Sequence, residues 1–216
     1  MISTKRRRTS KNLMSNPLFV RGEYNGECGW DIALIKACHV HEPSLQLLSF
    51  QSTKLNDKKN VDKVVHFFVD DQKFEVLYNH PKRHIRKLAQ YKYVLTPDFS
   101  LLTDMPLWVQ LYNLGKSRWC GKLWQEAGVP IIPTVCWSTP DSYSFVFLGL
   151  EKGTTVAIST LSVRSGKMEQ ELFLNGYREM IARIEPNVIY CYGRPFPEME
   201  GNIIEIGYNS TIRRSA

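Results

Sequence analysis

Runs of apolar and β-branched residues alternate with stretches of helical spacing through the second half of the chain. The runs predict strands and the stretches between them predict helices. Strand–helix–strand order with short loops implies parallel pairing and right-handed crossovers. We therefore expect an α/β fold, with a mostly parallel sheet and helices packed on it. The strands are expected at 93–96, 129–135, 155–160 and 188–192, with an edge strand at 202–208.

Two long helices are expected between these strands, the second at 168–184, and a short helix or turn is expected at 141–150. The first has Asp104 as its N-cap and Pro106 in its first turn, and Gly115 and Gly121 weaken it enough to split it. On this helix Lys116 and Lys122 are expected to face solvent. Its tryptophans have the spacing of a buried face and are expected in the core: Trp108, Trp119 and Trp124.

The first half of the chain has weaker patterns. A short helix is expected at 31–38 and a strand at 45–50, while 61–71 fits either a helix or a strand. Pro81 favours the start of a helix that runs to about residue 91.

The net charge of +7 comes from the two ends of the chain. The body between them is neutral, with 21 basic and 21 acidic residues. We expect residues 1–16 to be a disordered basic tail and 17–216 to form a single α/β domain. The terminal basic residues are Lys5, Arg6, Arg7, Arg8, Lys11, Arg213 and Arg214.

The sequence favours a cytoplasmic protein. No apolar run reaches the roughly 20 residues that span a bilayer, and the N-terminal region lacks the apolar part of a leader. Five cysteines without tight spacing fit free thiols in a reducing compartment. No metal site is expected, because paired metal-ligand spacing is missing, and no cofactor is indicated. The nearest candidates for a metal are Cys28, Cys38, His39 and His41.

Polar residues follow each of the four expected strands, where open parallel sheets bind their ligands. Asp98 directly follows the first strand and is the strongest candidate, as a base or as a metal ligand. The alternative is a structural role in which Asp98 caps the following loop. Arg118 is expected to pack its stem and bond a carboxylate. The other candidates for this site are Asn113, Arg118, Thr134, Trp137, Lys152, Ser159 and Thr160.

The dipeptide Pro97-Asp98 also suggests a metal-dependent hydrolase or nuclease. That pattern requires a second acid and a lysine, separated by one residue, on the next strand. Segment 129–137 has neither, and Glu151 and Lys152 are adjacent, so they would face opposite sides of a strand. The nuclease interpretation therefore stays an alternative.

A second feature is the basic segment from Lys82 to Lys92, which contains no acidic residue. Together with the N-terminal tail, this segment can contact phosphates and make nucleic-acid binding depend on salt. An ordinary solvated helix face and a solubilising tail explain the same residues. The candidate nucleic-acid-binding residues are Lys5, Arg6, Arg7, Arg8, Lys82, Arg83, Arg86 and Lys87.

A longer pattern matches one family. It runs from Val94-Leu95-Thr96-Pro97-Asp98-Phe99-Ser100 through Arg118, Trp137-Ser138 and Ile158-Ser159-Thr160 to Tyr192-Gly193. Over roughly residues 60–193 the chain resembles domain-of-unknown-function family forty-four seventeen. The resemblance implies a phage, prophage or mobile-element protein, and it implies no particular reaction.

Three hypotheses about function follow. The first is a phage or mobile-element accessory protein of the host cytoplasm, acting on or near DNA or RNA in replication or host takeover. The second is an enzyme with its polar site centred on Asp98. The third is a protein that binds and inhibits a host defence or replication factor. None of them involves a membrane.

Overall fold

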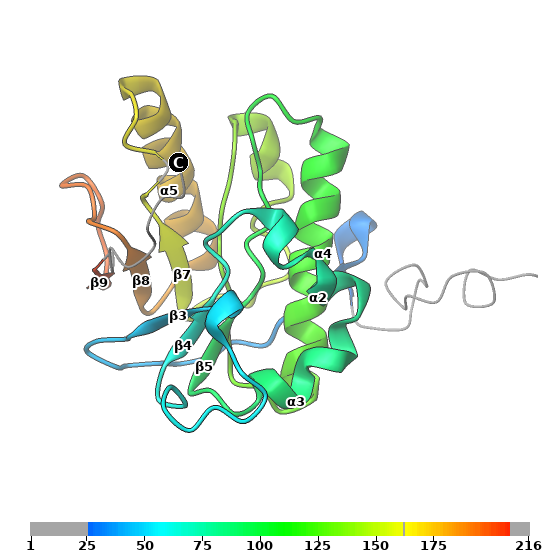
Figure 1. The fold of residues 1–216 in the computed structure, drawn as a ribbon. Helices are drawn as coiled ribbons and strands as arrows, with labels where there is room; N and C mark the ends of the chain where they lie inside the picture. Colours follow the sequence, from blue (N-terminus) through cyan, green and yellow to red (C-terminus); the bar gives the residue numbers. More distant parts are fainter. Residues whose placement is uncertain (1–25, 162, 208–216) are drawn as a thin grey trace, which may run out of the picture.

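The computed structural model describes residues 26–161 and 163–207. The expected tail at 1–16 and its basic residues lie outside this part of the chain. Within it, seven parallel strands follow one another in space in the order of the sequence (Figure 1), which confirms the α/β fold with a parallel sheet. The strands are β3 (Leu47–Ser49), β4 (Val64–His66), β5 (Tyr93–Leu95), β6 (Ile131–Ile132), β7 (Val156–Ser159), β8 (Ile189–Tyr192) and β9 (Ile203–Ile206).

A single bridge joins β6 to β7 and makes the sheet continuous. Thr134 pairs with Ala157 in parallel. The Ala157 amide donates to the carbonyl of Pro133 at 2.9 Å, and the Val135 amide donates to Ala157 at 2.9 Å. The break between Ile132 and Thr134 is explained by Pro133, which has no N–H to give to a ladder.

The sheet curls into a partly closed barrel. Crossovers between successive parallel neighbours are right-handed as a rule, which places the connecting helices on one face of the sheet and lets the other face turn inward. Side chains from distant strands meet there, because the ring of Tyr192 stacks on Phe68 at 5.2 Å and lies 5.5 Å from the ring of His66. Among the described residues no ladder joins β3 to β9, and the barrel is open along that edge.

Helices cover the outside of the curled sheet (Figure 1). The two long helices are α4 (Leu107–Glu126) and α5 (Lys167–Ile184). Between β4 and β5 the chain forms α2 (Glu75–Asn79), the 3-10 helix η5 (Pro81–His84) and α3 (Ile85–Leu88), in place of the single helix expected after Pro81.

Helix α4 differs from its prediction in several ways. Pro106, rather than Asp104, is the N-cap residue, and the helix continues unbroken through both glycines. Gly121 serves close packing, since a Cβ there would lie 2.6 Å from side-chain atoms of Ile35 and Thr96. Trp108 is 71% exposed, whereas Trp119 and Trp124 are core residues as predicted. The first turn of the helix projects beyond the sheet, and this explains the difference.

The two lysines expected in solvent on α4 are buried. The ammonium group of Lys116 lies 3.2 Å from Glu75 Oε2 and 3.9 Å from the centre of the Phe99 ring. Lys122 pairs with Glu126 at 3.1 Å. Both lysine stems cover apolar surface while their charges are partnered, which makes burial tolerable.

The helix predicted at 31–38 is wrong. Ile32–Ala33 is a short strand, β2, paired with β1 (Gly26–Glu27), and the following residues are extended. Their main-chain groups bond to distant parts of the chain: Ile35 donates to the carbonyl of Gly149 at 3.0 Å and Val40 donates to Thr155 Oγ1 at 2.9 Å. These tertiary bonds replace the bonds of a helix.

The segment 35–45 closes the amino end of the barrel, where it crosses the lower part of Figure 1. Cys38 accepts a hydrogen bond from the amide of Thr155, just before β7. Glu42 bonds through its main chain to the Tyr190 hydroxyl of β8 and through its carboxylate to Lys92, just before β5, at 2.8 Å. The opposite, carboxyl end is therefore the end at which a ligand can enter.

Candidate functional site

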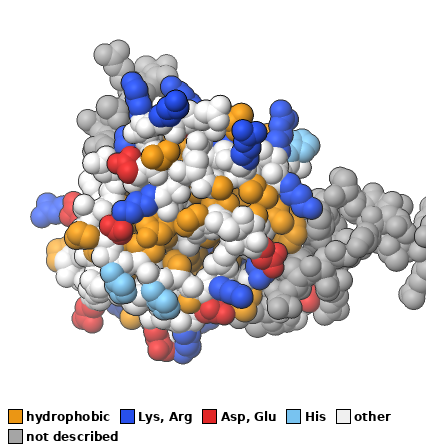
Figure 2. Space-filling model, turned by 90° about the horizontal axis from the view of Figure 1, so that it is seen from below, with side chains coloured by type: hydrophobic (Ala, Val, Ile, Leu, Met, Phe, Trp, Pro, Cys, Tyr) orange, Lys and Arg blue, Asp and Glu red, His pale blue; other side chains and the backbone are white. Residues whose placement is uncertain are grey.

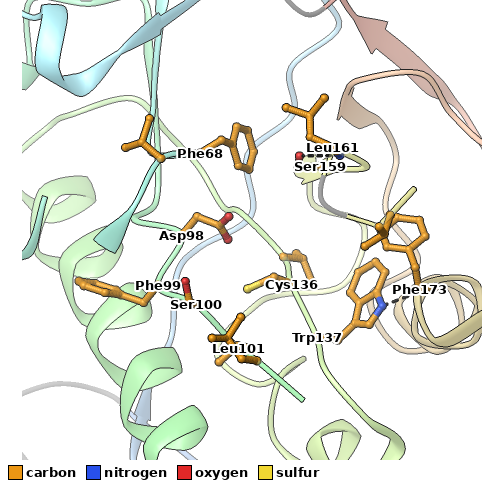
Figure 3. A pocket seen from close by; sticks show the side chains of 14 residues that line it. Phe68, Asp98, Phe99, Ser100, Leu101, Cys136, Trp137, Ser159, Leu161 and Phe173 are labelled. Atoms are coloured by element: carbon orange, nitrogen blue, oxygen red, sulfur yellow. Dashed lines mark hydrogen bonds between the residues drawn. The ribbon is translucent and has the colours of Figure 1, made fainter. Parts of the chain in front are cut away.

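A cavity of about 310 Å³ opens at the carboxyl ends of four successive strands. Its lining comes from the segments that follow β4, β5, β6 and β7, together with Phe173 of α5. This is the position that the strand-end rule predicts for a ligand in a parallel sheet. Figure 3 shows Asp98, Cys136 and Ser159 facing the interior of the cavity, with the rings of Phe68, Trp137 and Phe173 around them.

Asp98 is the titratable carboxyl of the lining. The Cys136 thiol donates a hydrogen bond to this carboxyl, while the buried Oδ1 atom has no partner within the described structure. Burial is the main cause that raises the pKa of Asp98 to about 6; the hydrogen bond from Cys136 lowers it, Asp71 adds to the rise and Arg118 opposes it. The carboxyl therefore gains and loses its proton close to neutral pH, which is the range a general acid or base needs.

The loop that contains Asp98 is capped by a different carboxylate. Asp71, in the 3-10 helix η4 (Asp71–Lys73), accepts from the Ser100 amide at 3.1 Å and from its hydroxyl at 2.9 Å. Asn113 of α4 fixes the same loop by donating to the Ser100 carbonyl at 2.7 Å. With these two contacts, the loop is held without help from Asp98.

Cys136 follows β6 and faces Asp98. Burial raises the pKa of its thiol well above the ordinary value, and the negative charge of Asp98 acts in the same direction. The thiol is protonated at neutral pH and serves as a hydrogen-bond donor. In this state it is not a thiolate nucleophile.

Arg118 lies behind the cavity and organises its wall. Its guanidinium group donates to three main-chain carbonyls and thereby ties the end of β6 to the loop that precedes β7. Its side chain is 1% exposed, so the charge is solvated by peptide dipoles in place of water. The acceptors are the carbonyls of Leu148 (3.0 Å), Thr134 (3.0 Å) and Val146 (3.2 Å).

The remaining residues predicted for the site fall into two groups. Trp137 and Ser159 line the cavity with Asp98. Thr134 and Thr160 are buried behind it. Thr134 donates from its amide to the Thr96 hydroxyl and from its own hydroxyl to the Thr96 carbonyl, just after β5. Thr160 donates to the carbonyl of Arg194 at 3.0 Å.

Lys152 lies away from the other predicted site residues. It precedes β7 and therefore belongs to the opposite end of the sheet from the cavity. There it forms an exposed ion pair of 2.5 Å with Glu185, just after α5. The structure brings together Asp98, Trp137 and Ser159 and leaves Lys152 outside.

Phe68, Asp71 and Cys136 belong to the site although the sequence patterns did not select them. Cys136 was accessible to prediction, because it follows the same strand as Trp137 at the carboxyl end. Phe68 and Asp71 fall in 61–71, where helix and strand patterns fitted equally, so no strand end could be placed there. Phe173 comes from a helix and had no signal of this kind.

The basic segment lies at the end of the sheet away from the cavity, because η5 and α3 lead into the start of β5. Lys82, Arg83 and Arg86 are exposed, whereas Lys87 is half-buried with its ammonium 4.0 Å from the centre of the Phe50 ring. Figure 2 views this end of the molecule: Lys and Arg side chains are spread around the rim of an apolar area, with Asp and Glu among them.

Within residues 26–161 and 163–207, no group of three or more His, Cys, Asp or Glu side chains is placed to hold a metal ion. None of the described helices has the length and apolarity needed to cross a membrane.

The fold and its cavity define the class: an α/β protein with a partly closed parallel barrel and a polar pocket at the carboxyl ends of its strands. The chain belongs to the family described as Domain of unknown function (DUF4417), whose model matches residues 24–209. The match includes the first part of the ordered chain, which the motifs at 60–193 did not cover.

Two curated relatives come from phages. The chain is 48% identical over 130 residues to the Gene 1 protein of Mycobacterium phage L5, covering 60% of this chain and 57% of that protein. It is 44% identical over 130 residues to the Gene 1 protein of Mycobacterium phage D29, covering 60% and 48%. The chain thus spans about half the length of the curated relatives it matches. No solved structure matches.

Proposed function

We propose that the cavity binds a small molecule and that Asp98 exchanges a proton with it as a general acid or base. The observation that supports this most directly is that Asp98 lines the cavity while its buried Oδ1 atom has no hydrogen-bond partner in the described structure. The pKa of this carboxyl lies at about 6. An acceptor buried without a partner is costly, and protein structures keep few of them. A bound ligand that donates a hydrogen bond would remove the cost.

The surroundings of Asp98 support proton exchange over a structural role. The loop is already held by Asp71 and Asn113. A structural carboxylate would be expected to accept several hydrogen bonds and have a lowered pKa, whereas burial raises the pKa of Asp98. The metal-dependent hydrolase or nuclease alternative is less well supported, because the nearest acid, Asp71, already accepts two hydrogen bonds from Ser100.

A ligand screen tests the proposal. Thermal shift with a panel of small metabolites would be run on the wild-type protein, on Asp98→Asn and on the control Asp141→Asn, whose carboxyl is exposed on the 3-10 helix η6 (Pro140–Ser144). We expect at least one compound that stabilises the wild type and the control, and loses its effect in Asp98→Asn. Compounds that act equally on all three proteins, or an Asp98 pKa near 3.9 by NMR, would contradict the proposal.

We also propose a nucleic-acid contact, in keeping with an accessory role on or near DNA or RNA. Its support is the exposed group Lys82, Arg83 and Arg86, which has no acidic partner in the described part of the chain. Replacing the three by Gln, or deleting residues 1–11, should weaken binding to duplex DNA or to RNA and flatten its salt dependence. The control is Lys58→Gln with Lys59→Gln, also exposed. Binding that is absent, or equal in all variants, would contradict this contact.

Binding to a host protein has one observation in its favour. Trp108 is 71% exposed at the start of α4, and Leu102 and Leu107 near it in the chain are also exposed. A photo-crosslinker at position 108 should then capture one defined host protein, and Leu102→Ser should reduce the yield. Crosslinks spread over many proteins would contradict a specific partner.

A further inference from the structure

The cavity wall is aromatic on several sides. Phe68 comes from the end of β4, Trp137 from the end of β6 and Phe173 from α5, and Figure 3 shows their rings around the space that Asp98 faces. Aromatic faces favour a flat, unsaturated partner, by stacking or, for a cation, through the ring quadrupole. The wall therefore suits a flat ring better than a sugar or a flexible chain.

The charges around the cavity disfavour an anionic ligand. No Lys or Arg belongs to the described lining. The guanidinium group of Arg118, whose charge acts on Asp98, is bound by three carbonyls. Phosphate and carboxylate ligands ordinarily require a free guanidinium or ammonium group. Asp98, once ionised, would repel an anion. A ligand that is neutral or positive avoids both problems.

The carboxyl of Asp98 in the lining requires a ligand that donates hydrogen bonds. Oδ1 of Asp98 is a buried acceptor without a partner. A carboxylate accepts N–H donors well, and adjacent N–H groups on one edge of a ring can meet its two oxygens together. The volume of about 310 Å³ is at the small end of the range for ligand sites, ~300–1,000 Å³, which fits one ring system with small substituents.

We infer that the cavity binds a flat, nitrogen-containing aromatic base, without phosphate, whose N–H edge lies on the Asp98 carboxyl and whose faces lie against Phe68, Trp137 and Phe173. The inference rests on the proposed small-molecule site and names its ligand class. The Cys136 thiol donates to the same carboxyl and leaves lone pairs free for the ligand edge. The groups that bias the charge on Asp98 are Cys136, Asp71 of η4 and Arg118 of α4.

Three probes of similar size separate the features of this ligand. 2-Aminobenzimidazole has the flat ring and the N–H edge, benzofuran has a flat ring without N–H, and phenyl phosphate has a ring and an anionic group. Binding would be measured by calorimetry on the full chain, with Trp fluorescence as a second readout. We expect 2-aminobenzimidazole to bind at least tenfold more tightly than the other two.

Variants and pH then locate the contact. Asp98→Asn should weaken 2-aminobenzimidazole at least tenfold, whereas Asp141→Asn should not. Affinity for the wild type should rise by up to about tenfold per pH unit below pH 6, because the carboxyl must lose its proton to accept the cation. Affinity should then level off until the probe itself loses its proton. In Asp98→Asn this pH dependence should disappear.

Failure of the inference differs from failure of the proposed function. Benzofuran or phenyl phosphate binding as tightly as 2-aminobenzimidazole, or a pH profile unaffected by Asp98→Asn, would overturn the ligand class. The small-molecule site itself would stand if another compound in the metabolite screen still depended on Asp98. If no compound depended on Asp98, both would fall.

Discussion

The indole of Trp137 lies directly on Gly176 of α5: a Cβ at position 176 would come within 2.1 Å of the indole Cδ1 atom. The indole Nε1 also donates to the carbonyl of Phe173, one turn earlier on the helix, at 3.1 Å. Since Trp137 and Phe173 both line the cavity, the backbone of α5 fixes the position of one wall.

Gly176→Ala should therefore displace Trp137. Alanine favours a helix over glycine by ~1 kcal/mol, but forcing a methyl group against a packed ring costs ~1–3 kcal/mol, so we expect a net loss of stability. Trp fluorescence should change as well. Gly115→Ala on α4 is the matched control, because nothing lies within 4 Å of its Cβ position, and it should be neutral or stabilising. Equal melting temperatures for the two variants would contradict this packing.

The raised pKa of Asp98 makes a prediction about stability and pH. Its pKa in the folded state is about 6, above the ordinary value of 3.8, so its protonated form is favoured by folding. The contribution is fully present below pH 3.8 and is lost as pH rises through 6, up to about 3 kcal/mol for the ionised group. Asp98→Asn should thus raise the melting temperature at pH 7.5 by several degrees.

The check is a melting curve at each pH from 4 to 8. The difference in melting temperature between Asp98→Asn and the wild type should be small at pH 4 and largest above pH 6. A difference of constant size would contradict the raised pKa of Asp98, and a variant that is less stable at pH 7.5 would show that the carboxylate stabilises the fold.

The pKa of His66 is shifted in the opposite direction, so its effect on stability depends on pH with the opposite sign. Burial lowers its pKa from 6.5 to about 4, and its Nδ1 atom accepts a hydrogen bond from the amide of Phe68 at 3.2 Å. Stability from the neutral ring is present above pH 6.5 and is lost as pH falls toward 4, by up to about 3 kcal/mol. His66→Asn should flatten this acid limb in chemical denaturation, and His41→Gln at an exposed position should leave it unchanged. An NMR pKa for His66 near 6.5 would refute the prediction.

Arg118→Met should destabilise the fold strongly. The change leaves three buried carbonyls without donors, and breaking such a buried network costs ~3–5 kcal/mol. Arg178→Met, at an exposed position on α5, should change the free energy of unfolding by less than ~0.5 kcal/mol. Urea denaturation measures both. A small effect of Arg118→Met would mean that the contact between the end of β6 and the loop before β7 does not depend on the Arg118 side chain.

The second half of the fold was predictable because its signals are local. Helix α5 and strands β5, β7 and β8 each have their period within their own residues, and the structure confirms them. The extended segment 35–45 was not predictable, since its partners Thr155 and Tyr190 lie more than a hundred residues away.

The candidate site was predictable only as far as the strand ends were. Asp98 follows a clear strand, and the structure places it in the cavity lining. Asp71 could not be assigned to the site, because it ends the segment 61–71, whose pattern fits a helix and a strand equally. Lys152 lies near a glycine turn at the start of a strand, and residue type alone does not tell which end of a sheet such a turn occupies. The curling that brings Phe68 to Tyr192 depends on the order of strands, which has no local signal.

Segment 35–45 lies across the amino ends of the strands, so a ligand reaches the cavity from the carboxyl ends. If the cavity converts one compound into another, substrate and product share the same space, and the product should inhibit competitively.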